Sequence, residues 1–362
     1  MLTLKKSKSD EKKLYDEIKN NDVERVKSII AKANEKNKIL KLKYLLNLAI
    51  ENNNIEIVKL LFEYANSHNI FLDLDEKDNN GKYPLLYAIF NNNIDIIKLI
   101  IEFSDSYYPL DLYEKDNKGN FPLLSAIKNN NIEIVKILFE YANSHNYPLK
   151  LNDHDYNRDY SLLHAISNNN INMVKLIIEF ANSNNFPLCL NEQNVKREYP
   201  LLLAINNNNI EIVKILIEFS YSHNYLLSLN DQDIKGNFPL LSAVRNNNIN
   251  IVKLLINYAN INFITLKLNQ TDKKQENPIY NAVIKKNIEM AKLLIKYAEN
   301  HDITLYLNEE TNGEYFIKHV YDTYDDEMLK LFIEYAKRYF IGLNCTSSIL
   351  MILYGKIIKR IG

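Results

Sequence analysis

A unit of about 39 residues recurs along this chain, and this recurrence constrains the fold more than any other feature of the sequence. An alanine in a "PLLxA" stretch marks each copy, and the steps between successive marker alanines are 39, 38, 39, 39, 39 and 39 residues. Self-similarity at a fixed period of this length is typical of solenoids and other repeat arrays. The marker alanines are Ala49, Ala88, Ala126, Ala165, Ala204, Ala243 and Ala282.

Each copy is predicted to fold as a short helix, a tight turn, a longer helix and an extended loop. The copy "PLLSAIKNNNIEIVKILFEYA" opens with Pro122, and proline is well tolerated at the first position of a helix. Asparagine tolerates positive φ, so the three asparagines are predicted to end the first helix and to cap the second. In the second helix the polar residues Glu133, Lys136 and Glu140 form one narrow stripe. Neighbouring copies must therefore cover most of this helix.

The loop of each copy carries a Leu-x-Leu alternation, such as Leu110 and Leu112, which indicates an extended segment with one packed face. A turn with aspartate first and glycine fourth follows, as in "DNKG", and fits a type I turn. Three copies have Arg158, Arg197 and Gln275 in place of this glycine. We expect the loops of these three copies to differ in shape.

With these features assembled, the sequence resembles the ankyrin repeat family. The family pattern is roughly D-x-x-G-x-T-P-L-H-x-A-x-x-x-G-H-x-E-I-V-K-L-L-L, and "DNKGNFPLLSAIKNNNIEIVKILFEYA" matches its turn, its Pro-Leu, its alanine and its "IEIVKIL". The resemblance covers about residues 44 to 342. An aromatic residue stands in place of the family's threonine and a leucine in place of its histidine, as at Phe121 and Leu124. Apolar packing is expected to replace that hydrogen-bonded corner.

The expected fold is mainly all-α: an α-solenoid of stacked helix-turn-helix, ankyrin-like repeats with extended or hairpin loops. A different helical-hairpin solenoid is the alternative. Residues 1–43 are interpreted as an N-terminal capping repeat and 44–343 as an array of about eight units. Residues 344–362 are interpreted as a C-terminal capping helix, because the open end of a solenoid exposes apolar surface. An amphipathic segment that contacts a partner or a membrane is the alternative for these last residues.

Composition excludes several classes of function. The 362 residues carry a formal net charge of −1, so no basic field attracts nucleic acid or an anionic membrane. No apolar run reaches the length of a membrane span, and two cysteines 156 positions apart form no pattern. We expect an intracellular, cytoplasmic and monomeric protein. No phosphate-binding glycine loop, HExxH motif or paired CxxC is present, so we expect no enzyme activity, no cofactor and no metal.

Three recurring side-chain series receive structural interpretations. Histidines at the ends of alternate second helices, such as His68 and His145, lie too far apart to share a metal ion and are read as solvated residues. Lysines and glutamates four residues apart, such as Lys136 and Glu140, are read as a solvated face, with a docking strip for a charged partner as the alternative. The aromatic residues from Tyr64 to Tyr335 are read as core stacking rather than as a ligand platform.

The favoured function is a non-catalytic scaffold that binds an unknown protein partner through a concave surface of loops and first helices. The third and sixth residues after the first-helix proline vary among copies, whereas the packed positions hardly change. The alternatives are a regulatory or targeting subunit of an enzyme complex and a purely structural spacer. The candidate contact residues are His154, Tyr156, Arg158 and His164, followed by Lys196, Arg197 and Arg245.

Overall fold

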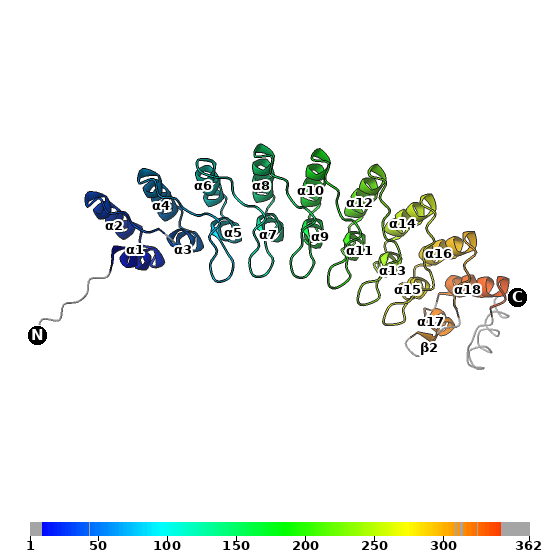
Figure 1. The fold of residues 1–362 in the computed structure, drawn as a ribbon. Helices are drawn as coiled ribbons and strands as arrows, with labels where there is room; N and C mark the ends of the chain where they lie inside the picture. Colours follow the sequence, from blue (N-terminus) through cyan, green and yellow to red (C-terminus); the bar gives the residue numbers. More distant parts are fainter. Residues whose placement is uncertain (1–8, 43, 308–309, 312–313, 324, 342–362) are drawn as a thin grey trace, which may run out of the picture. The chain divides into compact units, whose positions relative to one another are not determined.

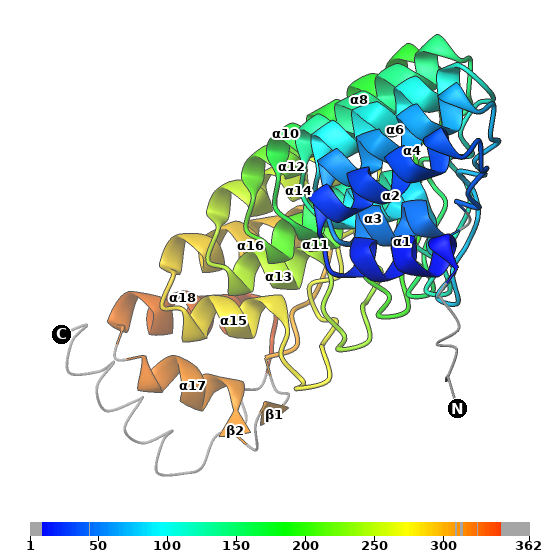
Figure 2. The ribbon, with the colours of Figure 1, turned by 90° about the vertical axis from the view of Figure 1, so that its left-hand side faces the viewer.

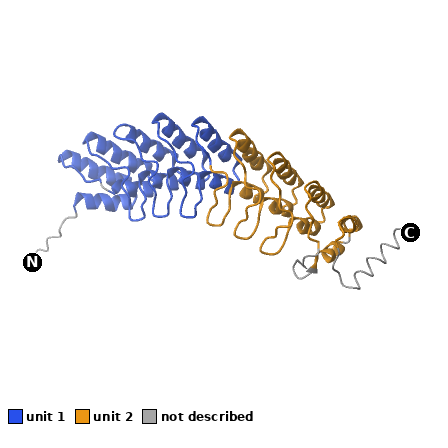
Figure 3. Cartoon of the chain, turned by 45° about the vertical axis from the view of Figure 1, so that its right-hand side comes forward, with its two compact units in different colours: residues 1–188 blue, residues 189–362 orange. Residues whose placement is uncertain are grey.

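The structure is a computed structural model, and it describes residues 9–42, 44–307, 310–311, 314–323 and 325–341. The chain divides into two compact units, Met1–Leu188 and Cys189–Gly362 (Figure 3). Unit 1 contains α1 (Asp10–Lys19), α2 (Val23–Glu35), α3 (Leu45–Glu51), α4 (Ile55–Ser67), α5 (Pro84–Phe90), α6 (Ile94–Asp105), α7 (Pro122–Lys128), α8 (Ile132–Ser144), α9 (Ser161–Ser167) and α10 (Ile171–Ser183). Unit 2 contains α11 (Pro200–Asn206), α12 (Ile210–Ser222), α13 (Pro239–Arg245), α14 (Ile249–Ile261), α15 (Pro278–Ile284), α16 (Ile288–Asn300), β1 (Glu310–Thr311), β2 (Glu314–Tyr315), α17 (Phe316–Asp322) and α18 (Asp326–Arg338).

Within each unit the helices form two layers. The seven-residue helices contact one another in sequence, as α5 contacts α7 and α11 contacts α13. The longer helices form the second layer, as α4 contacts α6 and α12 contacts α14 (Figures 1 and 2). β1 and β2 pair as a two-residue antiparallel hairpin before α17. The predicted all-α repeat solenoid is confirmed.

The longer helices are buried on most sides, as the narrow polar stripe predicts. In α8 the residues Ile134, Val135, Leu138 and Tyr141 are each at most 3% exposed, while Glu133, Lys136 and Glu140 lie in solvent. Burial of a large aliphatic or aromatic side chain stabilises the fold by about 1.5–3 kcal/mol. A single repeat offers too few neighbours for such burial, so the repeats stabilise one another.

The asparagine turns have the two roles that the sequence predicts. The middle residue of each triplet lies in the left-handed region, for example Asn130 with φ 56°. The last asparagine caps the longer helix: Oδ1 of Asn131 accepts from the backbone N–H of Glu133 at 2.9 Å and of Ile134 at 3.1 Å. Such a cap stabilises a helix by about 1 kcal/mol.

The same asparagines also join consecutive repeats, which the sequence did not predict. The first asparagine of a triplet donates to a backbone carbonyl in the short helix of the preceding repeat. Nδ2 of Asn129 does so to the oxygen of Ile89 at 2.6 Å. The third donates to the middle asparagine of the preceding triplet, as Nδ2 of Asn131 does to Oδ1 of Asn92 at 2.8 Å. A turn with all three asparagines is therefore tied to the preceding repeat by two side-chain hydrogen bonds, one to its short helix and one to its turn.

The aromatic residue near the end of each longer helix is buried, so its reading as core is confirmed. Its hydroxyl, where it is a tyrosine, also holds the Leu-x-Leu segment of the preceding repeat. The backbone N–H of Leu110 donates to the hydroxyl of Tyr141 at 2.7 Å, and Leu110 and Leu112 are each 1% exposed. The Leu-x-Leu residues are buried as predicted, although they belong to no strand.

The histidines at the ends of the longer helices act as C-terminal caps. The ring of His145 stacks on Tyr141 with centroids 4.1 Å apart, and its Nδ1 lies 3.0 Å from the Tyr141 carbonyl oxygen. His68 has the same arrangement on Tyr64. These contacts bind each histidine to its own helix end.

The predicted caps at the chain ends remain predictions. In residues 1–43, α1 and α2 form a helix pair, and α1 contacts α3 while α2 contacts α4. The predicted C-terminal capping helix, residues 344–362, lies outside the described residues. Among the helices that the structure does describe, none has the length and hydropathy needed to cross a bilayer.

Candidate functional site

Six loops in the described chain, which we call fingers, join a Leu-x-Leu segment to the next short helix. In the first finger, the backbone N–H of Gly81 donates to the oxygen of Asp78 at 3.0 Å, which closes the predicted four-residue turn. Oδ1 of Asp78 accepts from the backbone N–H groups of Asn80 and Lys82, both at 2.8 Å, and fixes the turn from inside. The fingers are residues 75–83, 113–121, 152–160, 191–199, 230–238 and 269–277.

The three fingers without the turn glycine keep the same turn, so the expectation that they differ in shape is wrong. The backbone N–H of Arg158 donates to the oxygen of Asp155 at 3.0 Å, as glycine does elsewhere. Arg158, Arg197 and Gln275 have φ of 61°, 59° and 62°. A side chain in this left-handed region costs about 1–2 kcal/mol relative to glycine. The side-chain hydrogen bonds of the first turn residue hold the shape against this strain.

Neighbouring fingers within a unit lie backbone against backbone. In unit 2 the N–H of Lys273 donates to the oxygen of Lys235 at 3.0 Å. A Cβ added to Gly236 would lie 2.7 Å from the Cα of Asp272, which is closer than real contacts allow. The N–H of Ile234 makes the same bond to the oxygen of Lys196 at 3.0 Å beside Arg197, so the fingers approach one another with or without the glycine.

The second carboxylate oxygen of the finger aspartate has a different partner in different repeats. Some partners come from the same repeat and others from the short helix of the preceding repeat. The pairs are Tyr87 Oη with Asp78 at 2.6 Å, Lys128 Nζ with Asp155 at 2.6 Å, and Arg245 Nη2 with Asp272 at 2.8 Å. Arg245 also contacts Glu276 at 2.9 Å.

A buried charge cluster surrounds Asp155, whose side chain is 3% exposed. Burial by itself would raise the pKa of Asp155, but the hydrogen bond and charge of Lys128 hold this pKa below its usual value. Burial and then the charge of Lys128 lower the pKa of His164, whose Nε2 lies 3.6 Å from Oδ2 of Asp155. The ligand atoms of Asp155, Asp159 and His164 lie within 4.8 Å of one another, which suits a metal ion. The ammonium of Lys128 already neutralises Asp155, so the cluster reads as an internal ion network.

The predicted contact residues fall into two groups. His154, Tyr156 and Arg158 are exposed on the 152–160 finger of unit 1, and Tyr156 is 72% exposed. Nδ1 of His154 lies 3.0 Å from the Asp155 carbonyl oxygen, and His154 forms an isolated bridge with Tyr160.

The remaining predicted contact residues are two on a finger of unit 2 and two in short helices. Lys196 and Arg197 are exposed on the 191–199 finger of unit 2. His164 and Arg245 are only partly exposed, because each lies against the finger aspartates described above.

The third position after the start of the short helix is not the variable surface that the sequence suggested. Five of its six side chains are at most 8% exposed, because this position faces the base of the finger. Its variation therefore changes internal contacts. These five are Tyr87, Ser125, Leu203, Ser242 and Asn281.

Sequence reasoning missed apolar residues at two finger tips of unit 2. Val195 is 54% exposed and Ile234 is 43% exposed, directly after the first residue of the turn. The equivalent position holds Asn79 and Asn117 in two fingers of unit 1. This departure from asparagine was visible in the sequence.

Comparisons with known proteins agree with this architecture. A family model described as "Ankyrin repeats (3 copies)" matches residues 14–108, 68–150, 105–186, 162–265 and 224–306. Among solved structures, the ankyrin repeat domain of Bcl-3, described as a unique member of the IkappaB protein family, is similar with a TM-score of 0.50 and 17% sequence identity. That match covers 69% of this chain and 97% of the Bcl-3 domain, and it supports the fold alone. No curated protein sequence matches the chain.

Proposed function

This chain belongs to the ankyrin repeat family, and from that premise we propose that it is a non-catalytic scaffold that binds a partner protein through its fingers. The contact residues in this proposal are His154, Tyr156 and Arg158 in unit 1 and Val195, Lys196 and Arg197 in unit 2. His164 and Arg245 lie behind them, next to the finger aspartates Asp155 and Asp272. Repeat arrays generally use such extended rows of loops for binding.

The left-handed arginines carry the proposal. Arg158 and Arg197 each occupy a turn position where glycine would be more stable by about 1–2 kcal/mol. Strained residues of this kind concentrate at functional sites, where the side chain has a use that outweighs its local cost.

The neighbours of each arginine suit protein recognition. Tyr156 lies two residues before Arg158, and Val195 lies two residues before Arg197, so each tip pairs an exposed apolar group with a cation. Tyrosine and arginine are enriched among the residues that dominate binding energy at protein interfaces. The chemistry favours a partner surface with acidic and apolar groups.

The test separates binding from stability at one residue. Arg158→Gly relieves the backbone strain, so we expect the free energy of unfolding to rise by about 1 kcal/mol. The same variant removes the guanidinium, so we expect affinity for a partner isolated with the wild-type chain to fall about fivefold or more. Urea denaturation and surface plasmon resonance measure the two effects.

Gln275→Gly is the matched control, because Gln275 has the same backbone conformation and lies outside the proposed contacts. It should gain similar stability and keep the wild-type affinity. If Arg158→Gly and Tyr156→Ala both bind as tightly as the wild type, the finger of unit 1 is not the contact surface. A chain that acts only as a spacer would show no saturable binding of any partner protein.

A further inference from the structure

One repeat of unit 1 lacks a finger. Only residues 43 and 44 separate Leu42 from α3, whereas nine residues separate Leu74 from α5. The residue before each short helix is nevertheless aromatic in both repeats. Tyr83 is fully buried in this position with φ −136°, but Tyr44 is 51% exposed with φ +63°.

The buried aromatic residues show what this position normally contains. The hydroxyl of Tyr83 donates to the carbonyl oxygen of Glu114 at 3.0 Å, and that of Tyr199 donates to Asp231 at 3.0 Å. Phe121, Tyr160 and Phe238 fill the same position and are at most 3% exposed. Five of the six fingers therefore end in a buried ring, and in two of these the ring hydroxyl donates to a backbone carbonyl of the following finger.

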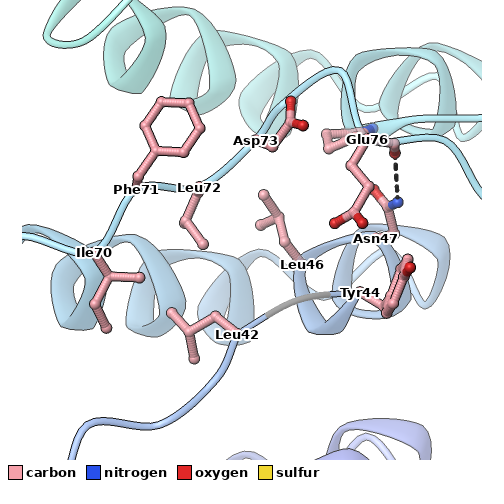
Figure 4. Close-up of a pocket in the computed structure, with 10 residues that line it drawn as sticks. Leu42, Tyr44, Leu46, Asn47, Ile70, Phe71, Leu72, Asp73 and Glu76 are labelled. Atoms are coloured by element: carbon pink, nitrogen blue, oxygen red, sulfur yellow. Dashed lines mark hydrogen bonds between the residues drawn. The ribbon is translucent and has the colours of Figure 1, made fainter.

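In the repeat without a finger this ring position is a pocket of about 310 Å³ (Figure 4). Its wall includes Leu42, Leu46 and Leu72, and the exposed ring of Phe71 lies at its edge. A volume of this size is at the small end for ligand sites and suits one side chain better than a larger molecule.

The wall of the pocket includes Asn47, whose side-chain oxygen is an unsatisfied acceptor buried from solvent. Nδ2 of Asn47 donates to the Glu76 carbonyl oxygen at 3.1 Å, the equivalent of the Glu114 carbonyl that Tyr83 contacts. Asn47 is 8% exposed, and its Oδ1 has no hydrogen-bond partner. The repeats with fingers have an apolar residue in this place, such as Leu86 or Leu124. A buried acceptor without a donor costs about 1–3 kcal/mol, so a ligand with an O–H group gains by entering.

We infer that this pocket binds a tyrosine side chain presented by a partner protein. The ring takes the position that Tyr83 occupies in its own repeat, and the phenol O–H donates to Oδ1 of Asn47. Asp73 and Glu76 line the same pocket, so a basic residue beside the tyrosine is favoured. The inference extends the proposed function, since it assumes a protein partner, but it concerns a different surface from the finger tips of residues 154–158 and 195–197.

Binding of p-cresol, a small molecule that reproduces the tyrosine side chain, tests the pocket without any partner protein. The full chain with ¹³C-labelled leucine and isoleucine methyl groups is titrated with p-cresol and, separately, with toluene. We expect saturable shifts of the methyl signals of Leu42, Leu46 and Leu72. The Kd for p-cresol should be roughly 2- to 10-fold lower than that for toluene, the value of one net hydrogen bond.

Two variants examine how the pocket binds. Asn47→Leu restores the residue type of the other repeats and frees the Glu76 carbonyl, to which the phenol can donate as Tyr83 does to Glu114, so this variant should keep the preference for p-cresol. Tyr44→Ala tests whether the chain's own ring is the occupant. The inference is overturned if the pocket methyls do not shift, if the wild type shows no preference for p-cresol over toluene, or if Tyr44→Ala binds p-cresol more than tenfold tighter. The proposal for the fingers is tested separately, by the affinity of Arg158→Gly for its partner.

Discussion

The two ends of each short helix contrast in how much they vary. At its C-terminal end, the asparagine turn makes the same contacts in repeat after repeat: Asn91, Asn129 and Asn168 each donate to a carbonyl of the preceding short helix at 2.6–2.8 Å. At its N-terminal end, the finger keeps its backbone turn but changes its side-chain ties. The finger aspartate meets a tyrosine in one repeat, a lysine in another and an arginine in a third.

We call the row of asparagine turns the asparagine edge and the row of fingers the finger edge. The contrast between them follows from what each edge contacts. A turn that bonds to the turn before it must be compatible with a copy of itself, so any change disturbs two neighbours. Finger tips contact one another through backbone atoms, which are present whatever the side chain, and the Oδ1 hydrogen bonds of the finger aspartate fix the turn within one repeat. The asparagine edge therefore maintains stacking, while the finger edge is free to differ between repeats.

The largest expected effect is at the asparagine edge. Replacement of Asn129, Asn130 and Asn131 by alanine removes a carbonyl tie, a left-handed residue and a helix cap. Each loss costs about 1 kcal/mol, so we expect unfolding to be easier by about 3 kcal/mol. Urea denaturation followed by circular dichroism measures this change.

An asparagine on the finger edge is the control for that variant. Asn79→Ala alters an exposed finger tip, and surface changes of this kind stay within about 0.5 kcal/mol. Equal destabilisation by the two variants would mean that the edges do not differ in their contribution to stacking.

The next effect lies between the edges, where the two helices of a repeat meet. Ala165 is fully buried in α9, and leucine at this position would overpack the contact. We expect Ala165→Leu to destabilise the chain by about 1–3 kcal/mol in the same assay. Wild-type stability would show that the helix pair can separate without cost, contrary to its close packing.

A smaller loss of stability is expected when the ion pair between Arg245 and the buried finger aspartate Asp272 is removed. Arg245→Met leaves the side chain of Asp272, which is 3% exposed, without its cation. A buried charge that loses its partner costs about 1–3 kcal/mol, and because Arg245 itself is 31% exposed we expect about 1 kcal/mol. Asn206→Ala is the control at the same helix position, and it should be neutral because Asn206 is exposed. A neutral Arg245→Met would show that the contact between Arg245 and Asp272 does not stabilise the fold.

The repeat, its two helices and its asparagine caps were predictable because local chemistry decides them. Positive φ at Asn130 and the cap at Asn131 depend on residues within one turn of the chain. The tie from Asn129 to Ile89 depends on where a carbonyl of another repeat points, and no local pattern records that.

The candidate site was predictable as a set of loops and less so as individual residues. The finger position identified Tyr156 and Arg158 as exposed. No sequence pattern indicated that a left-handed turn accepts arginine, or that the third short-helix position faces inward. The empty ring position beside Tyr44 depends on a missing finger, whose consequence appears only when repeats are compared in space.

The smallest expected effect concerns pH at the finger of unit 1. Burial and the charge of Lys128 lower the pKa of His164 in the folded chain below its ordinary value of 6.5. The unfolded chain therefore binds a proton that the folded chain does not, and stability must fall as pH decreases through about 6.5. Asp155 stays ionised in this range because its own pKa is lowered, so its charge does not change the sign. His164→Leu, which installs the residue type of Leu203, removes this loss. The unfolding midpoints of this variant, measured from pH 7.5 to 5, should then fall less steeply than those of the wild type. Parallel pH profiles of the two proteins would show that His164 takes up its proton as easily in the folded chain as in the unfolded one.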